Sequence, residues 1–131
     1  MQALEVTTFT AAVCGLIYLV LSYRVSQTRM SSRIAMGDAG NPDLITRMRT
    51  QANFGEYVPI ILILMGLIES EVGYSVLLGI ISGVLILSRI AHAIGMSRPS
   101  PNPFRVGGTA GTWLSLLMLS VWGLILAVRI I

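Results

Sequence analysis

The chain has 131 residues, which is enough for one domain and too few for a multidomain assembly. Hydrophobic residues make up 54% of the chain, charged residues only 11%, and the mean hydropathy is +0.79. A soluble domain usually carries about a quarter charged residues, so this composition excludes a water-covered fold and requires lipid around much of the surface. The net charge of +3 comes from nine basic residues, all of them Arg, against six acids.

Three segments contain uncharged runs long enough to cross a membrane. These runs cover residues 6–23, 72–88 and 106–128, and a crossing helix needs roughly 20 apolar residues. The first few residues lack a basic region, so we expect the first run to be a retained span and not a cleaved signal.

A fourth span is expected between the first and second of these runs. Its apolar stretch is short, but Asn41-Pro42-Asp43 is typical of a helix start, with a capping side chain, a proline at the first helical position and an acid in the first turn. The sequence therefore predicts one domain over residues 1–131, an all-α membrane protein with a four-transmembrane-helix bundle. The expected spans are about 4–26, 42–69, 73–96 and 106–129.

The arginines are distributed unequally between the expected loops. Arg24, Arg29 and Arg33 lie around the first loop, and Arg98 and Arg105 lie in the third, whereas the second is a tight acidic turn at 69–73. Loops rich in arginine stay on the cytoplasmic side of a membrane. The sequence therefore predicts that the first and third loops are cytoplasmic and that both termini lie on the opposite side.

Several classes of function do not fit this pattern. The arginines lie between apolar runs, so nucleic acid is not an expected partner. Cys14 lies within an apolar run, where packing is its expected role, and the chain's one histidine cannot build a metal site by itself. A small multidrug-type transporter would need an acid within the first span, whereas Glu5 lies at its edge and Glu56 is the acid expected to be buried.

Ionisable residues at membrane depth mark the candidate site, because such groups are costly there and usually face a bundle interior or a wet cavity. Arg49, Asn53 and Glu56 share one face of the second helix, at positions i, i+4 and i+7. Arg89 and His92 share a face of the third helix at a similar depth. Two interpretations stay open. Arg49, Glu56 and Arg89 form an ion-pair network that fixes packing, or the cluster binds an anionic ligand that guanidinium groups recognise.

The run Arg49-Thr-Gln-Ala-Asn53-Phe-Gly-Glu56-Tyr57-Val-Pro59 resembles the second-helix signature of the MAPEG family, the membrane-associated proteins in eicosanoid and glutathione metabolism. Arg89 followed by His92 is similar to the family's third-helix motif, and Pro103-Phe-Arg105 is similar to the Pro-x-Arg of its third loop. The resemblance covers nearly the whole chain and looks closest to the small bacterial members.

This resemblance implies a homotrimer in a bacterial inner membrane that binds glutathione as a cosubstrate between neighbouring copies. One copy would contribute Arg49, Asn53, Glu56 and Tyr57. Its neighbour would contribute Arg89, His92 and Arg105, and Arg24 is a looser candidate. Glu56 would hold the amino group of glutathione, the arginines its carboxylates, and Arg105 the thiolate, which an apolar electrophile would reach from the membrane.

Two functions stay open on this resemblance. The first is a glutathione-dependent transferase or peroxidase that acts on apolar electrophiles. The second is a membrane protein that binds glutathione or lipid without turnover, since Met96 stands where several catalytic members carry a tyrosine.

Overall fold

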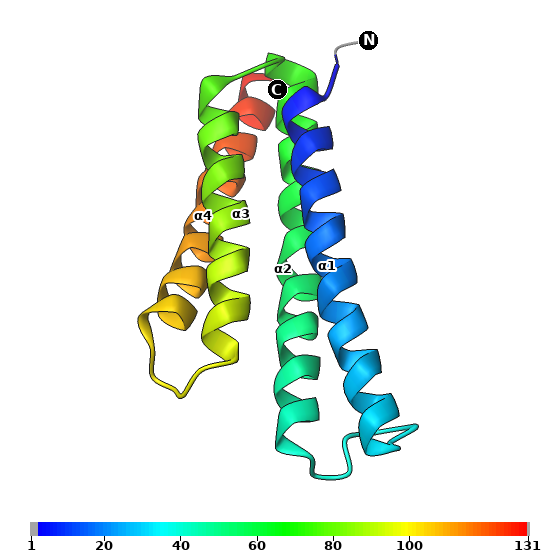
Figure 1. Cartoon of the computed structure of the whole chain (residues 1–131). Coiled ribbons are helices and arrows are strands. Elements are labelled where there is room, and N and C mark those ends of the chain that lie inside the picture. The colour runs from blue at the N-terminus through cyan, green and yellow to red at the C-terminus, as the bar shows by residue number, and fades with distance from the viewer. Residues whose placement is uncertain (1–2, 131) are drawn as a thin grey trace.

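The computed structural model describes residues 3–130 and consists of four helices with short connections (Figure 1). They are α1 (Glu5–Ser32), α2 (Pro42–Val72), α3 (Val76–Met96) and α4 (Pro103–Ile130). All four are long and apolar enough to cross a membrane, which confirms the predicted all-α membrane bundle. The described N- and C-terminal ends lie at the same end of the bundle as the α2–α3 turn, and the other two loops lie at the opposite end (Figure 1). We call this opposite end the loop end.

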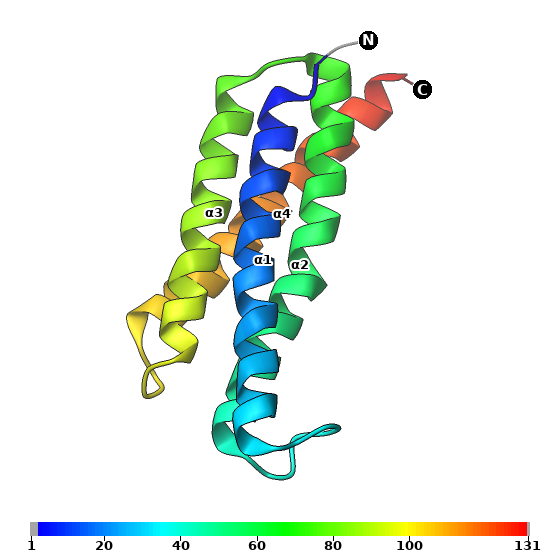
Figure 2. The same cartoon turned by 45° about the vertical axis from the view of Figure 1, so that its right-hand side comes forward.

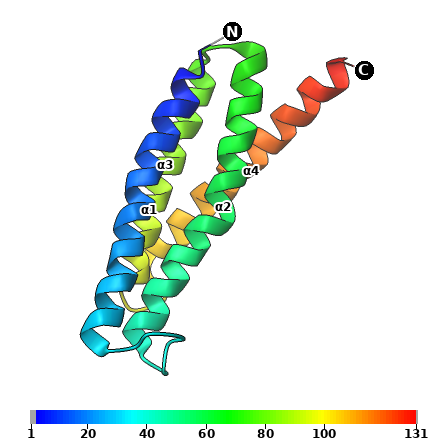
Figure 3. The same ribbon diagram turned by 90° about the vertical axis from the view of Figure 1, so that its right-hand side faces the viewer.

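The helices pair as α1 with α2 and α3 with α4 (Figure 1), and the second pair shares the more extensive contact, as Figure 2 shows from another side for the whole bundle of four. Three glycines on the facing sides of α3 and α4 explain the close approach. A Cβ on Gly108 would overlap the backbone of His92, one on Gly95 the backbone of Arg105, and one on Gly111 the side chain of Ser88. Towards its C-terminus α4 diverges from the other helices (Figure 3). The α3–α4 contact is therefore fixed near the loop end, where the polar residues lie.

The apolar core lies along the inner faces of the four helices. It is built from residues that are almost fully buried, among them Cys14, Phe54, Ile61, Leu85 and Leu119. Many large apolar side chains face outwards instead, as a lipid-covered surface requires. The placement of Cys14 agrees with its expected packing role.

Two helix starts follow from local sequence. Oδ1 of Asn41 accepts hydrogen bonds from the backbone N–H groups of Asp43 (3.0 Å) and Leu44 (3.1 Å), with Pro42 at the first helical position, as predicted. Asn102 does the same for α4, because its Oδ1 accepts from the backbone N–H of Arg105 at 3.0 Å. α4 therefore begins at Pro103, before the expected start at residue 106, so Arg105 lies in the first turn of a helix and not in the loop.

The start of α1 depends instead on a distant residue. Glu69 of α2 accepts hydrogen bonds from the backbone N–H groups of Val6 and Thr7, each at 2.8 Å, so its two carboxylate oxygens cap the first turn of α1. The carboxylate is fully buried. The prediction of an acidic turn from residue 69 onwards is therefore wrong at Glu69, which lies inside α2 and ties it to α1.

Candidate functional site

Arg89 is the centre of the polar cluster and connects three helices. Its side chain is 1% exposed. Nη2 donates to Oδ1 of Asn53 on α2 at 2.9 Å, and Nη1 donates to Oγ1 of Thr112 on α4 at 3.3 Å. The guanidinium also lies over the ring of Phe54, with 5.2 Å from Cζ to the ring centroid. Arg89 therefore holds Asn53 in one orientation from inside the protomer.

His92 lies beside Arg89 in the same buried region. Nη2 of Arg89 donates to Nδ1 of His92 at 3.5 Å, and His92 is 3% exposed. The His92 backbone is also what a Cβ on Gly108 of α4 would meet first. Arg89 and His92 therefore support the candidate site from the interior of the protomer, and both are too deeply buried to form its surface.

Arg49 and Glu56 face the outside of the protomer. Both are exposed, although Asn53 between them points inwards to Arg89. Within residues 3–130 the one ion pair is Arg47 with Asp43, at 3.1 Å, so neither Arg49 nor Glu56 is paired. The prediction that Glu56 is the buried acid is wrong, because the Glu56 side chain is exposed although Asn53, three residues before it, is directed to Arg89 of α3. Glu69 is the buried acid instead.

The same contacts test the interpretation that Arg49, Glu56 and Arg89 form an ion-pair network within a single copy of the chain. Arg89 contacts amide, hydroxyl and imidazole groups and no carboxylate within the described part of the chain, and its Nε has no hydrogen-bond partner there. The network of Arg49, Glu56 and Arg89 does not form in the protomer. Arg89 and Asn53 also meet within one chain, whereas the family resemblance places them on neighbouring copies.

Two further candidates lie close to this cluster. Tyr57 is half-buried on α2, one residue after Glu56, and packs against the apolar core. Arg105 is exposed in the first turn of α4, and its backbone packs against Gly95 of α3. Among the candidates close to Arg89, Arg49, Glu56 and Arg105 are thus the ones whose charged side chains are exposed on the protomer surface.

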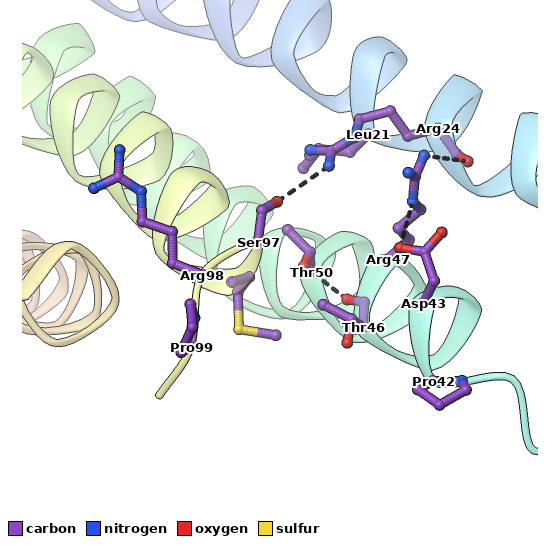
Figure 4. A pocket seen from close by; sticks show the side chains of 11 residues that line it. Leu21, Arg24, Pro42, Asp43, Thr46, Arg47, Thr50, Ser97, Arg98 and Pro99 are labelled. Carbon is purple, nitrogen blue, oxygen red and sulfur yellow. Dashed lines mark hydrogen bonds and ion pairs between the residues drawn. The ribbon is translucent and has the colours of Figure 1, made fainter. Parts of the chain in front are cut away.

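Arg24 belongs to a different part of the molecule. It lines a pocket of about 560 Å³ at the loop end, between α1, α2 and the start of the α3–α4 loop (Figure 4). Nη2 of Arg24 donates to Oγ of Ser97 at 3.1 Å, and Arg47 lies in the same pocket, paired with Asp43. The structure therefore does not bring Arg24 together with Asn53 and Arg89 in one protomer.

Thr112 and Asn102 are the supporting residues that sequence reasoning missed. Thr112 lies within the long apolar run of α4 and also donates to the carbonyl of Gly108 at 2.8 Å. Asn102 donates to the carbonyl of Gly95 at 2.9 Å and caps α4, so it fixes both ends of the α3–α4 loop. A polar residue in an apolar run and an Asn directly before a proline were the signals that could have identified them.

Comparisons with known proteins agree with the residue pattern. The model of the MAPEG family matches residues 7–125. The chain is 28% identical over 131 residues to the inner membrane protein YecN of Escherichia coli strain K12, with 95% of this chain and 99% of YecN aligned. YecN of Escherichia coli O6:H1 strain CFT073 gives the same values. No solved structure matches the chain.

The likeness to an inner membrane protein and the four membrane-spanning helices place this chain in a bacterial inner membrane. The family match spans all four helices, from the first turns of α1 to the last turns of α4, and includes both the α2 motif and the buried Arg89 that orients it. The resemblance predicted from the sequence is thereby confirmed, and the chain belongs to the MAPEG family.

Proposed function

We propose that the protein is a homotrimer that binds glutathione between neighbouring copies and activates its thiol for reaction with apolar electrophiles. The observation that carries the proposal is the pair Arg49 and Glu56, exposed and unpaired on one face of α2 within residues 3–130. Ionised groups that face lipid at membrane depth are unfavourable. A second copy and a charged ligand over this face would remove that cost. Membership of the MAPEG family supports a function related to glutathione in general.

The chemistry of the accessible residues fits glutathione, which carries two carboxylates, one ammonium group and one thiol. Arg49 provides a guanidinium for a carboxylate, and Glu56 provides an anion for the ammonium group. Oδ1 of Asn53 accepts from Arg89, so the amide Nδ2 remains to donate to a ligand carboxylate. Arg89 and His92 act in this scheme as positioning residues, and Tyr57 borders the same face.

Arg105 is the candidate for activating the thiol. A thiolate is the nucleophilic form of a thiol, and a neighbouring guanidinium lowers the thiol pKa. The thiol proton leaves to water, and the thiolate sulfur forms a bond to an electrophilic carbon as a leaving group departs. In the peroxidase form of the reaction, two glutathione molecules reduce a hydroperoxide to an alcohol and water and are oxidised to the disulfide. An apolar substrate enters from the surrounding lipid.

Glutathione titrated into the purified, detergent-solubilised protein tests this proposal through ultraviolet difference absorbance near the thiolate band. We expect a saturable signal that is lost in Arg105→Ala and retained in Arg129→Ala, which removes an arginine from the far end of α4. The absence of both a thiolate signal and a calorimetric heat of binding would overturn the proposal. A heat of binding without the thiolate signal would support the second candidate, a binder without turnover, for which Met96 in place of a tyrosine is the motivating feature.

A further inference from the structure

The pocket around Arg24 lies apart from the residues proposed to hold glutathione and is rich in positive charge. Three arginines line it, Arg24, Arg47 and Arg98, against a single carboxylate, Asp43. Asp43 is already paired with Arg47. Arg24 donates a hydrogen bond to the neutral hydroxyl of Ser97. The guanidinium of Arg98 lies over the ring of Phe104, with 4.4 Å from Cζ to the ring centroid. Two guanidinium groups are therefore available at this opening without an acidic partner among residues 3–130.

An apolar groove continues from this pocket along the lipid-facing side of α1 and α3. The groove has a volume of about 490 Å³ and shares four lining residues with the pocket, Leu21, Arg24, Ser97 and Arg98. Its remaining lining is aliphatic, from Ile17, Val20, Ile90, Ala93 and Ile94. From Arg24 to Ile17 the helix rises by about 10 Å, so the groove extends away from the loop end.

This combination has the polarity of a phospholipid. The basic pocket lies at the loop end, beside the C-terminal end of α3, and the groove runs along the apolar part of the two membrane-spanning helices α1 and α3. Guanidinium groups bind phosphate oxygens through charge-assisted hydrogen bonds. A zwitterionic headgroup would bring an additional cation to a site that already holds an excess of them.

We propose that the pocket and the groove together bind one acidic phospholipid per protomer, with its phosphate at Arg24 and Arg98 and one acyl chain along α1 and α3. The site is independent of the proposed glutathione site, because none of Arg49, Asn53, Glu56 and Arg105 lines the pocket or the groove. Charge complementarity selects the acidic headgroup, and the aliphatic groove distinguishes a lipid from a free phosphate ester.

Native mass spectrometry of the detergent-solubilised protein tests the headgroup. The probes are dioleoyl phosphatidylglycerol and dioleoyl phosphatidylcholine, which have the same chains and differ in net charge. We expect retained phosphatidylglycerol at one molecule per chain and much weaker retention of phosphatidylcholine. Arg98→Gln should weaken phosphatidylglycerol binding about fivefold, as expected for one basic group at an anionic lipid. Arg33→Gln, an exposed arginine outside the pocket, should leave it unchanged.

A second pair of variants tests the groove. Val20 is 57% exposed and lines the groove, whereas its neighbour Leu19 is 64% exposed and does not. Val20→Trp should therefore reduce phosphatidylglycerol retention, and Leu19→Trp should not. Equal retention of the two lipids, or no effect of Arg98→Gln and Val20→Trp, would overturn the proposal.

A competition experiment distinguishes the possible sources of phosphate. Glycerol phosphate, which lacks acyl chains, should not displace the lipid, and displacement would identify a soluble phosphate ester as the ligand and reject the lipid. Absence of lipid together with protection of Val20→Cys from a soluble thiol reagent in the oligomer would assign the groove to a second copy of the chain. Glutathione affinity should be unchanged in Arg98→Gln, so this proposal and the proposed function can fail separately.

Discussion

Glu56 and Glu69 belong to the same helix but to opposite environments. Glu69 is fully buried at the end of the bundle opposite the loop end. Each of its two carboxylate oxygens accepts a hydrogen bond of 2.8 Å from a backbone N–H group of α1. Glu56 lies nearer the loop end, exposed on the outer face of α2, and takes part in no ion pair within residues 3–130. The protomer satisfies one of these carboxylates and leaves the other unsatisfied.

The difference separates a residue that stabilises the fold from one that remains available to a partner. A buried carboxylate with two donors from its own chain stabilises the packing of α1 on α2. An exposed carboxylate at membrane depth has an unfavourable environment until something outside the chain covers it. The comparison predicts that substitution of Glu69 changes stability and that substitution of Glu56 changes binding.

Glu69→Ala should give the largest effect. The substitution leaves the partly buried N–H groups of Val6 and Thr7 without an acceptor, and an unsatisfied group of this kind costs about 1 to 3 kcal/mol. We expect the free energy of unfolding to fall by about 3 kcal/mol, measured by denaturant titration in mild detergent. Glu71→Ala is the matched control, because Glu71 is exposed two residues further along. Equal losses in the two variants would show that the cap contributes nothing specific.

Arg89→Lys should affect both properties, because Arg89 connects the fold to the candidate site. A lysine cannot reproduce the guanidinium that bonds Asn53 and Thr112 at once. We expect a loss of about 2 kcal/mol in the free energy of unfolding, together with weaker glutathione binding as Asn53 becomes free to rotate. The two readouts are denaturant titration and calorimetry on the same preparation. Wild-type glutathione affinity in a destabilised Arg89→Lys protein would exclude the positioning role.

The sequence predicts those features of the fold and the candidate site that depend on residues close together in the chain. The spans follow from apolar length, and the start of α2 follows from Asn41 and Pro42, which are adjacent residues. The role of Glu69 was not predictable, because its partners Val6 and Thr7 lie 63 and 62 residues away. Helical spacing placed Arg49 and Glu56 on one face. Which face points inwards depends on α1, α3 and α4, and spacing on α2 contains no information about them.

Glu56→Gln should leave the fold intact and weaken glutathione binding about tenfold, close to 1.4 kcal/mol. The amide keeps the size of the side chain and removes the charge that would pair with the ligand ammonium group. Isothermal titration calorimetry gives the affinity, and light scattering checks that the oligomeric state is the same as in the wild type. Arg49→Ala should weaken binding in the same assay, through the loss of a carboxylate partner. Unchanged affinity in both variants would reject the assignment of this face as the glutathione site.

Asp43→Asn should have the smallest effect on stability and binding, because the Asp43 carboxylate is exposed and already has an ion-pair partner. Asp43 pairs with Arg47 at 3.1 Å, and the two side chains are 61% and 26% exposed, so solvent screens the pair. Exposed pairs one helical turn apart contribute about 0.5 kcal/mol or less, and Asn41 still caps α2 in the variant. We expect the free energy of unfolding to stay within about 0.5 kcal/mol of the wild-type value and the glutathione affinity to be unchanged.

The same substitution should not reduce phosphatidylglycerol retention, because it removes the one negative charge that lines the basic pocket. A loss of stability as large as that of Glu69→Ala would show that burial and hydrogen bonding are not what distinguishes the carboxylates of α2.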